Sequence, residues 1–403
     1  MSTINRRQFL AGAAALPLMA SALAQPLPAG RRKIAKIDLW LMVYPMKGYF
    51  KFFHGGANKG GRAAVLVRIT ADDGATGWGQ SVPIPRWSDE TLETCVIAIR
   101  DYYTAALIGL DPADLPAVES ALDHAIAPAF STGMPIARAG LETALWDLLG
   151  RAENKPLHEL WGKPAPEPLL LSWTVNTPKL EEVESVMGKG SELGYRNFNI
   201  KVGPDPEFDV KLARKVRELA PETFLWADAN GGYDPAVAIA AAPKLKEAGV
   251  DVLESPVRPN QISTYQAMVK QNALPILMDE GVVSMTDLRE FTKLGMMHGM
   301  AAKPARCGGL STCRAMISFL EENRMMWLGS GLTDPDLSLA GMLAVYAAHG
   351  LKKPAALNGP QFLDGSILTQ PIVVKDGFIH PPVGPGLGVE VDMEKVRALE
   401  VKV

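Results

Sequence analysis

Two different patterns of hydrophobic and polar positions divide the chain. Between residues 34 and 81, half-alternating apolar runs flank the turn signal Asp72-Asp73-Gly74, which is typical of antiparallel strands joined by a hairpin. Longer segments with apolar residues at helical spacing follow, at residues 88–108, 112–125 and 140–149. This order predicts a three-stranded sheet followed by helices, which is a small α+β domain.

After the Pro-rich segment 163–168, short apolar strands alternate with helix-length segments. The predicted strands are 169–175, 196–202, 223–228, 251–254, 275–279, 299–303, 325–328 and 355–357. The predicted helices include 205–219, 235–248, 260–271, 309–322 and 336–349. Eight strands separated by seven helical segments indicate a parallel α/β barrel. A doubly wound sheet is the alternative, but no Gly-rich dinucleotide fingerprint follows any strand.

The first residues have the layout of an export signal. Arg6-Arg7-Gln8-Phe9-Leu10 precedes an Ala-rich apolar stretch at residues 11–24, which is shorter than the roughly 20 residues that span a bilayer. Ala22-Leu23-Ala24 places small residues before a cleavage site at Gln25. The paired arginines favour the twin-arginine route and a periplasmic location. The alternative is a cytoplasmic protein with an unstructured N-terminus.

Composition narrows the function classes. The 403 residues are 47% hydrophobic and 21% charged, with a formal net charge of −3 and no long run of one sign. These values indicate large buried cores and no nucleic-acid partner. The three cysteines, Cys95, Cys307 and Cys313, show neither disulfide nor zinc spacing, so we expect buried free thiols.

Five successive predicted strands of the barrel end in an ionisable residue. Strands two to six end at Lys201, Asp228, Glu254, Asp279 and Lys303, at steps of 27, 26, 25 and 24 residues. Each step is about one strand–helix unit. Barrel enzymes place their chemistry at these carboxyl ends, so we expect the five side chains to meet at one mouth.

Each of these residues alone has an ordinary interpretation, such as a helix N-cap or a surface lysine. Together, three converging carboxylates would repel one another unless a divalent cation binds them. Oxygen ligands without Cys or His favour Mg²⁺, with Mn²⁺ as a substitute, over zinc. The flanking lysines fit the removal of a proton next to a substrate carboxylate, which forms an enediolate dianion. A nearby cation and the second lysine would lower the pKa of a lysine base.

From Ile34 to about Val391 the chain resembles the mandelate racemase and muconate lactonizing enzyme family of the enolase superfamily, and most closely its muconate lactonizing subgroup. The motifs that carry this resemblance are Asn199-Ile200-Lys201-Val202-Gly203, Asp228-Ala229-Asn230, Glu254-Ser255-Pro256, Asp279-Glu280 and Lys303-Pro304-Ala305-Arg306-Cys307-Gly308-Gly309. The resemblance implies metal ligands at Asp228, Glu254 and Asp279, an acid/base pair at Lys201 and Lys303, and supporting side chains at Asn230 and Glu280.

The resemblance also implies a fold and its boundaries. The expected fold is α/β, a modified (β/α)7β TIM-type barrel with an N-terminal α+β capping domain. We expect the export signal and linker at residues 1–30, the capping domain at 31–160, the barrel at 161–370, and a C-terminal segment at 371–403 that returns to the capping domain. Relatives are often even-numbered homo-oligomers, so a homo-oligomer is expected.

The chain departs from the family pattern at two strand ends. The family usually has Lys-x-Lys at the end of the second strand, and here Asn199 replaces the first lysine, which usually lies near the substrate carboxylate. Many relatives have a glutamate near the position of Thr333; Asp334 or Asp336 is a candidate substitute, although Asp336 also fits an N-cap of the next helix.

Two further segments bear on the substrate. The eighth strand ends at Leu357-Asn358-Gly359-Pro360, without the Asp-x-Asp pair of dipeptide epimerases and more like cycloisomerases. The loop from Tyr44 to Arg62 is expected to close over the site, with Tyr49, Lys51 and His54 as candidate substrate contacts.

The expected function is therefore a magnesium-dependent isomerase of a small carboxylate, either a cycloisomerase or a racemase or epimerase. A lyase is the alternative enzyme, which would dehydrate a hydroxy acid, a sugar acid or a hydroxyproline-like compound. An exported carboxylate-binding protein is the alternative without catalysis. Turnover of hydroxy acids, amino-acid derivatives and muconates would discriminate among them.

Overall fold

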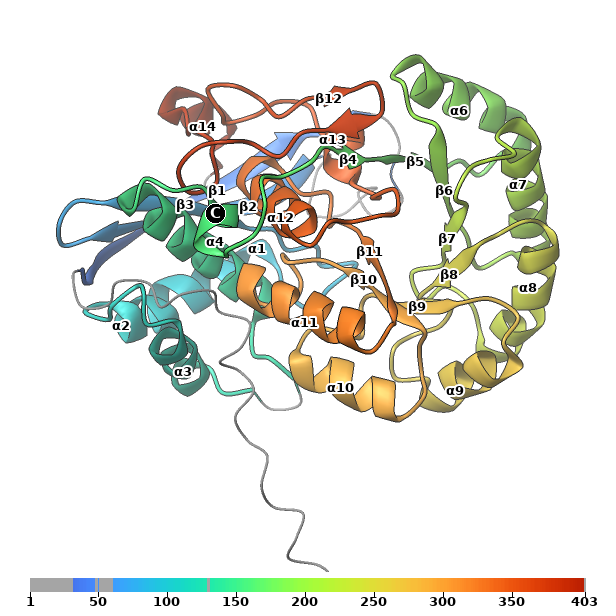
Figure 1. The fold of residues 1–403 in the computed structure, drawn as a ribbon, viewed down its shortest axis with the longest axis horizontal. Coiled ribbons are helices and arrows are strands. Elements are labelled where there is room, and N and C mark those ends of the chain that lie inside the picture. Colours follow the sequence, from blue (N-terminus) through green and yellow to red (C-terminus); the bar gives the residue numbers. More distant parts are fainter. Residues whose placement is uncertain (1–31, 48–49, 51–60, 129–130, 402–403) are drawn as a thin grey trace, which may run out of the picture.

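The computed structural model describes residues 32–47, 50, 61–128 and 131–401 (Figure 1). Its first part is an antiparallel sheet in the order β1-β2-β3, joined to helices. The elements are β1 (Ile34–Pro45), β2 (Gly61–Ala71), β3 (Thr76–Ser81), α1 (Leu92–Ile97), the π-helix η2 (Ala98–Tyr103), α2 (Thr104–Leu107), α3 (Leu115–Ala125), α4 (Pro135–Ala152) and α5 (Leu157–Leu160). The three-stranded sheet and its hairpin turn are as predicted.

The helix expected at residues 88–108 is later and less regular than predicted. It begins at Leu92, because Thr91 caps it through a reciprocal pair of hydrogen bonds with Thr94. Its second turn widens into η2 before α2 completes it. The spacing of apolar residues alone does not predict this cap or this π-helical turn.

Helix α4 is the central element of the capping domain. Every residue from Pro135 to Gly150 is buried, because the helix has β3 on one side and barrel helices on the other. The sheet approaches it closely: a Cβ added at Gly79 would lie 2.1 Å from the carbonyl oxygen of Gly140. Glycine at this strand position therefore permits the contact between sheet and helix.

The second part is a curled parallel sheet in the order β11-β10-β9-β8-β7-β6-β5, with helices on its outer side (Figure 1). Its strands are β5 (Ser172–Val175), β6 (Asn197–Lys201), β7 (Trp226–Asp228), β8 (Val252–Glu254), β9 (Ile276–Met278), β10 (Gly299–Ala302) and β11 (Met326–Gly329). Its helices are η3 (Leu180–Glu182), α6 (Val183–Glu192), α7 (Pro206–Leu219), α8 (Pro235–Glu247), α9 (Ile262–Gln271), α10 (Met285–Lys293), α11 (Leu310–Glu322) and α12 (Asp336–Ala348). This is the predicted modified TIM barrel.

The eighth predicted strand, at residues 355–357, is reduced to two isolated parallel bridges. Ala355 pairs with Leu171 beside β5, and Ala356 pairs with Ser330 beyond β11. These two bridges join the first and last strands of the curled sheet. The short helix α13 (Asn358–Phe362) follows where a full barrel would continue.

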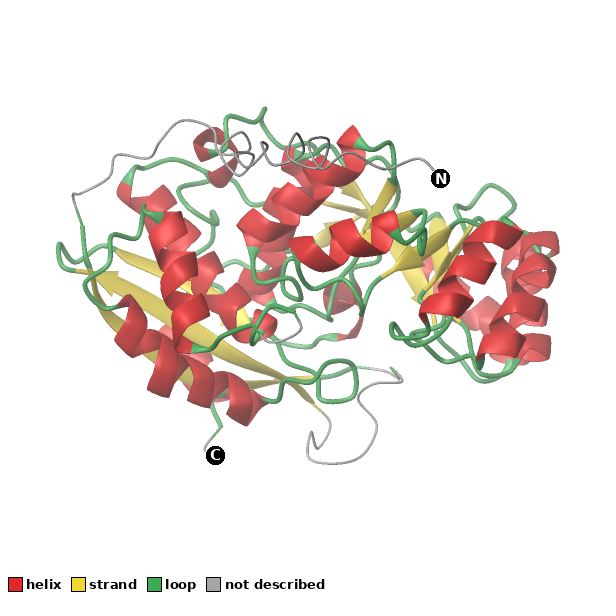
Figure 2. Cartoon of the chain, turned by 90° about the horizontal axis from the view of Figure 1, so that it is seen from below, coloured by secondary structure: helices red, strands yellow, loops and turns green. Residues whose placement is uncertain are grey.

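The C-terminal segment lies beside the capping sheet (Figure 2). Strands β12 (Val374–Lys375) and β13 (Phe378–Ile379) form a small sheet with β4 (Leu169–Leu170). Helix α14 (Met393–Leu399) contacts β1, and the backbone N–H of Val401 donates to the carbonyl of Leu41 at 2.8 Å.

Two smaller expectations are settled by the structure. The N-cap interpretation of Asp336 is wrong: α12 begins at Asp336 with Pro335 as N-cap, and the carboxylate of Asp336 accepts from Ser366 and Ile367 instead. The three cysteines are free and buried, as predicted. Among the described residues, no helix is long and apolar enough to cross a bilayer.

Candidate active site

Five ionisable side chains from neighbouring barrel strands lie at one end of the sheet. Strands β6, β7 and β8 end at Lys201, Asp228 and Glu254, which are aligned with one another in the strand register. Asp279 and Lys303 immediately follow the last residues of β9 and β10. The strand order equals the chain order, so the two lysines flank the three carboxylates as the sequence predicted.

Each lysine forms an ion pair with one of these carboxylates. The Nζ atom of Lys201 lies 2.5 Å from Oδ2 of Asp228 and 3.3 Å from Oδ1 of Asn230. Lys303 donates to Oδ2 of Asp279, and its Nζ lies 3.6 Å from Oε1 of Glu254. The lysine side chains are only 6% and 2% exposed, so these charges interact with little screening by solvent.

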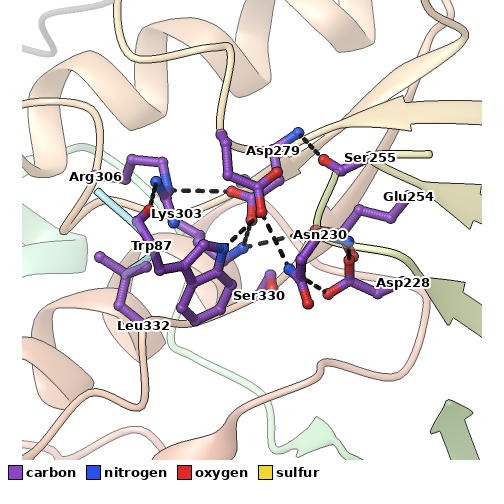
Figure 3. Close-up of polar contacts among 12 residues, drawn as sticks. Trp87, Asp228, Asn230, Glu254, Ser255, Asp279, Lys303, Arg306, Ser330 and Leu332 are labelled. Atoms are coloured by element: carbon purple, nitrogen blue, oxygen red, sulfur yellow. Dashed lines mark hydrogen bonds and ion pairs between the residues drawn. The ribbon is translucent and has the colours of Figure 1, made fainter. Parts of the chain in front are cut away.

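Asn230 forms hydrogen bonds with two acidic residues of this group, Asp228 and Glu280. The amide Nδ2 of Asn230 donates to Asp228 at 3.0 Å and to Oε1 of Glu280 at 3.1 Å (Figure 3). Asn230 reaches both because its backbone turns into the left-handed region, with φ of 48°. It therefore links the loop after β7 to the loop after β9.

Two residues of the site were missed by the sequence reasoning. Trp87, from the loop after β3, points into the space among the charged side chains (Figure 3). Its indole Nε1 donates to Oε1 of Glu280 at 2.6 Å. Its ring centroid lies 5.5 Å from Nζ of Lys201, 4.8 Å from Nζ of Lys303 and 5.2 Å from Cζ of Arg306, distances typical of cation–π contacts.

Arg306 is the second missed residue. Its Nε lies 3.2 Å from Oδ1 of Asp279, and its Nη1 donates to the carbonyl of Trp87 at 2.9 Å. It therefore ties the strand-end carboxylate to the capping domain. Hydrophobic periodicity does not identify Trp87 or Arg306 as site residues. The available signals are that Trp87 is an aromatic residue in a loop and that Arg306 lies inside a family motif.

Burial and charge shift the pKa values of these groups. Burial raises the pKa of Glu254 well above its ordinary value, and the charge of Asp228 adds to this effect. Burial also raises the pKa of Asp279, against the opposing charges of Arg306 and Lys303. Glu280 behaves differently: burial would raise its pKa, but Arg306 and Lys303 lower it to about 2.

The carboxylates around Lys303 set the direction of its pKa shift. Burial alone would lower its pKa, but the carboxylates of Asp279 and Glu254 raise the pKa above its ordinary value. The expectation of a lowered lysine pKa supposes a cation bound to these carboxylates, so it stays a prediction for the metal-bound protein.

The donor set fits a hard divalent cation. Three buried oxygens accept no hydrogen bond: Oε1 of Glu254, Oδ1 of Asp279 and Oε2 of Glu280. The first two lie in ion pairs with Lys303 and Arg306, and carboxylate oxygens of this kind are the ligands that a hard divalent cation prefers. Across the described ranges, no three acidic, cysteine or histidine side chains lie close enough to hold a metal in the arrangement shown. The ion pairs of Lys201 and Lys303 draw two of the three carboxylates toward the lysines instead.

The candidate substrate residues lie in different places. Asn199 is buried on β6, in hydrogen bonds with Ser172 and Thr174. The carboxylate of Asp334 accepts from the Leu332 backbone and from Ser338, both at 2.5 Å, so it holds its own loop. Asp336 holds Ser366 and the Ile367 backbone, as described above. Three candidates lie outside the described residues: Tyr49, Lys51 and His54. Most of the loop from Tyr44 to Arg62 also lies outside them.

A cavity of about 950 Å³ lies beside this group of charged residues rather than within it. Its walls include Thr174 on β5, Gly359 and Gln361 in α13, and Asp334. We therefore place the chemistry at the charged strand ends and treat this cavity as adjoining space.

Comparison with known proteins agrees with this architecture. Residues 57–162 match the model of the mandelate racemase/muconate lactonizing enzyme N-terminal domain, and residues 181–396 match the enolase C-terminal domain-like model. The fold and the ionisable strand ends define a class, the α/β barrels with a capping domain over the carboxyl ends of their strands. The chain belongs to the mandelate racemase/muconate lactonizing enzyme family of the enolase superfamily.

Individual relatives are distant but cover most of the chain. A chloromuconate cycloisomerase of Cupriavidus necator is 29% identical over 339 residues, which cover 83% of this chain and 90% of the relative. An N-succinylamino acid racemase of Thermus thermophilus is 28% identical over 371 residues, 91% of this chain and 96% of the relative. The crystal structure of 2-chloromuconate cycloisomerase from Rhodococcus opacus superposes with a TM-score of 0.83 at 24% identity, over 92% of this chain and 100% of that one.

Proposed function

We propose that this protein is a magnesium-dependent isomerase that removes the proton next to a substrate carboxylate. The observation that carries the proposal is the placement of Lys201 and Lys303 on either side of three strand-end carboxylates. Both ammonium groups lie within 5.5 Å of the ring centroid of Trp87, so they face a common space. Two relatives whose names state isomerase activities support the reaction class.

Asp228, Glu254 and Asp279 would hold the cation, Mg²⁺ or in its place Mn²⁺. When bound, it supplies positive charge that stabilises the negative charge developing on the substrate carboxylate. Asn230, Trp87 and Glu280 keep the surrounding side chains in place through their hydrogen bonds. The buried position of the lysines excludes water from the proton that they exchange with the substrate carbon.

The lysines perform the proton transfers. Lys201 is the principal acid/base, because it stands at the retained position of the family's Lys-x-Lys pair, at the end of β6. In a racemase or epimerase, one lysine removes the proton and the other returns it to the opposite face of the same carbon. In a cycloisomerase, one lysine transfers the proton and the other acts mainly through its charge.

Isotope exchange tests the proposal. Purified protein with Mg²⁺ in deuterated water is incubated with cis,cis-muconate, N-acylamino acids and hydroxy acids, and NMR follows each compound. We expect deuterium beside the carboxylate together with an isomer of the substrate. Accumulation of a keto acid would identify a dehydratase instead. No exchange with any carboxylate would contradict the proposed function.

Calorimetric titration with Mg²⁺ tests the metal ligands independently of turnover. Glu254→Gln removes a negative charge from the proposed ligand set and should weaken Mg²⁺ binding at least about 10-fold, while far-ultraviolet circular dichroism stays unchanged. Glu247→Gln, an exposed residue at the end of α8, is the matched control. Equal Mg²⁺ affinities of the two variants would exclude Glu254 as a ligand.

A further inference from the structure

Three buried side chains away from the strand ends contain four nitrogen atoms without a hydrogen-bond partner in the described part of the chain. These atoms are Nε1 of Trp161, Nε of Arg314 and both ring nitrogens of His349. Trp161 is 3% exposed, Arg314 is 5% exposed, and the side chain of His349 is 2% exposed. Buried polar groups are nearly always paired in native proteins, so these atoms require an explanation.

The three side chains come from different elements that meet where the two domains join. Trp161 directly follows α5 of the capping domain, Arg314 lies in α11, and His349 is the C-cap of α12. Helix α5 contacts α12, and α12 contacts α11. The Arg314 guanidinium lies over the ring of Trp161, with Cζ 4.3 Å from the ring centroid. Because α11 lies on the outer side of the barrel sheet, this junction is separate from the strand-end site (Figure 1).

The junction is rich in positive charge. Lys163, two residues after Trp161, is half-buried beside it. Burial, together with the positive charges of Lys163 and Arg314, lowers the pKa of His349 to about 4. Burial also lowers the pKa of Arg314 to about 10, against the charge of Glu142. Two cations and a neutral imidazole therefore lie close together.

The acids near the junction do not balance this charge. Both oxygens of Glu142 are used, because they accept from Nε1 of Trp146 and from the backbone N–H groups that begin α11. Oε2 of Glu321 lies 3.6 Å from Nδ1 of His349, but the Glu321 side chain is 44% exposed. A buried guanidinium without a counter-ion is costly, and an anion from solution would remove that cost.

We infer that this junction binds a tetrahedral oxyanion, of the class of phosphate or sulfate, between the capping domain and the barrel. Arg314 and Lys163 supply the charge, and the indole N–H of Trp161 and a ring N–H of His349 donate hydrogen bonds to it. Donors from three elements suit four oxygens that point in different directions better than the two coplanar oxygens of a carboxylate. The bound anion stabilises the contact between the domains and takes no part in the chemistry at the strand ends.

Titration with inorganic phosphate tests this inference. Calorimetry gives the dissociation constant of the full chain with Mg²⁺ present, and thermal unfolding is followed over the same phosphate concentrations. Phosphate at ten times its dissociation constant should raise the melting temperature by about 2 °C. Sulfate should bind as well, whereas acetate and chloride at equal ionic strength should give no comparable shift.

Phosphate and sulfate also stabilise proteins in general, because they are excluded from protein surfaces. Variants therefore separate the specific effect from the general one. Arg314→Met keeps an apolar chain over Trp161 and removes the charge, so it should lose the calorimetric binding and the specific part of the shift. Arg289→Met, at an exposed arginine of α10, is the matched control and should keep both.

Trp161→Phe keeps a ring under the guanidinium and removes one N–H donor. It should weaken phosphate binding about 10-fold, the loss of one hydrogen bond to a charged group. This variant decides the question if Arg314→Met does not fold. Phosphate affinity that is unchanged in Trp161→Phe or in folded Arg314→Met would overturn the inference, as would a wild type that binds no phosphate or binds acetate equally well.

Discussion

At the scale of single residues, the two strand-end lysines differ in their surroundings. Lys201 pairs with Asp228 and Asn230, whereas Lys303 is surrounded by Asp279, Glu254 and the ring of Trp87. The greater burial of Lys303 ties its charge more firmly to the carboxylates. We therefore expect Lys201 to carry more of the proton transfer.

Lysine variants test this difference. Lys201→Ala should lower turnover by about 10²- to 10⁴-fold, the usual contribution of a general acid or base. In a racemase, Lys303→Ala should also stop isomerisation, although either variant would still exchange the proton of one enantiomer. Proton exchange is followed by NMR in deuterated water, with the exposed Lys211→Ala as control. Wild-type exchange and turnover in Lys201→Ala would refute the mechanism.

Trp87 is a residue whose role is visible only in three dimensions. Trp87→Phe keeps a ring over the cations but removes the N–H that donates to Glu280 at 2.6 Å. Because a hydrogen bond to a buried charged group contributes about 1.5–3 kcal/mol, the free energy of unfolding should fall by about that amount. Denaturant unfolding measures it, with Trp40→Phe in β1 as the control. Equal losses in the two variants would mean that the bond to Glu280 contributes nothing specific.

At the scale of elements, buried carboxylates hold the N-termini of two helices across the fold. Glu90 accepts the backbone N–H groups of Ile136 and Ala137 at the start of α4, at 2.6 and 2.9 Å. Glu142, within α4, accepts from Leu310 and Ser311 at the start of α11. Such bonds satisfy backbone donors that a helix leaves free at its first turn. The loop between β3 and α1, helix α4 and the barrel are thereby connected in series.

The Glu90 contact predicts a pH dependence of stability. Burial raises the pKa of Glu90 from 4.5 to about 7, so the folded chain holds a proton there that the unfolded chain releases. The contribution of Glu90 to the free energy of unfolding is fully present below pH 4.5. It falls by up to about 3 kcal/mol as the pH rises toward 7. Urea midpoints from pH 4.5 to 7.5 should therefore decline more steeply in the wild type than in Glu90→Gln.

The control for this experiment is Glu159→Gln, an exposed residue of α5. Its urea midpoints should run parallel to those of the wild type across the same pH range. Parallel curves for Glu90→Gln and the wild type would show that the pKa of Glu90 is not raised in the folded protein.

At the scale of the whole molecule, Arg62 joins the capping sheet to the barrel. Its guanidinium is fully buried and donates to carbonyls of Ala63, Val82 and Pro83 on the capping side. Its Nε donates to carbonyls of Leu332 and Thr333 in the loop after β11, at 3.0 and 3.2 Å. Trp87 and Arg306 make a second connection near the strand ends. These buried polar contacts add to the packing of α4 in holding the capping domain against the barrel.

Cellular location is also a property of the whole molecule. We propose that the protein is exported through the twin-arginine route and cleaved near Gln25. Cell fractionation with N-terminal sequencing should find a periplasmic form that begins there. The double change Arg6→Lys and Arg7→Lys should trap the precursor inside the cell, because that route requires the paired arginines. A full-length cytoplasmic protein in the native host would contradict this prediction.

The sequence by itself determined the elements and the chemistry of the strand ends. The spacing of apolar residues predicted the strands of the capping sheet and all barrel strands but the eighth, because such patterns reflect which face of an element is buried. The regular spacing from Lys201 to Lys303 placed five charges at one end of a barrel, since parallel strands end together. The motifs around them identified the family. All of this information is local, or repeats at a fixed interval along the chain.

Only the tertiary structure decided which distant residues meet. Trp87 reaches Glu280 across 193 positions of the sequence, and no spacing rule connects them. Asp336 fits a helix cap by sequence, yet Ser366 and Ile367 bind its carboxylate because the C-terminal segment lies against it. Asn199 stands out in the sequence as a missing lysine, but only the fold shows that hydroxyls of Ser172 and Thr174 on β5 donate to its side-chain oxygen. Such contacts follow from packing between segments, and packing is settled only when the whole chain folds.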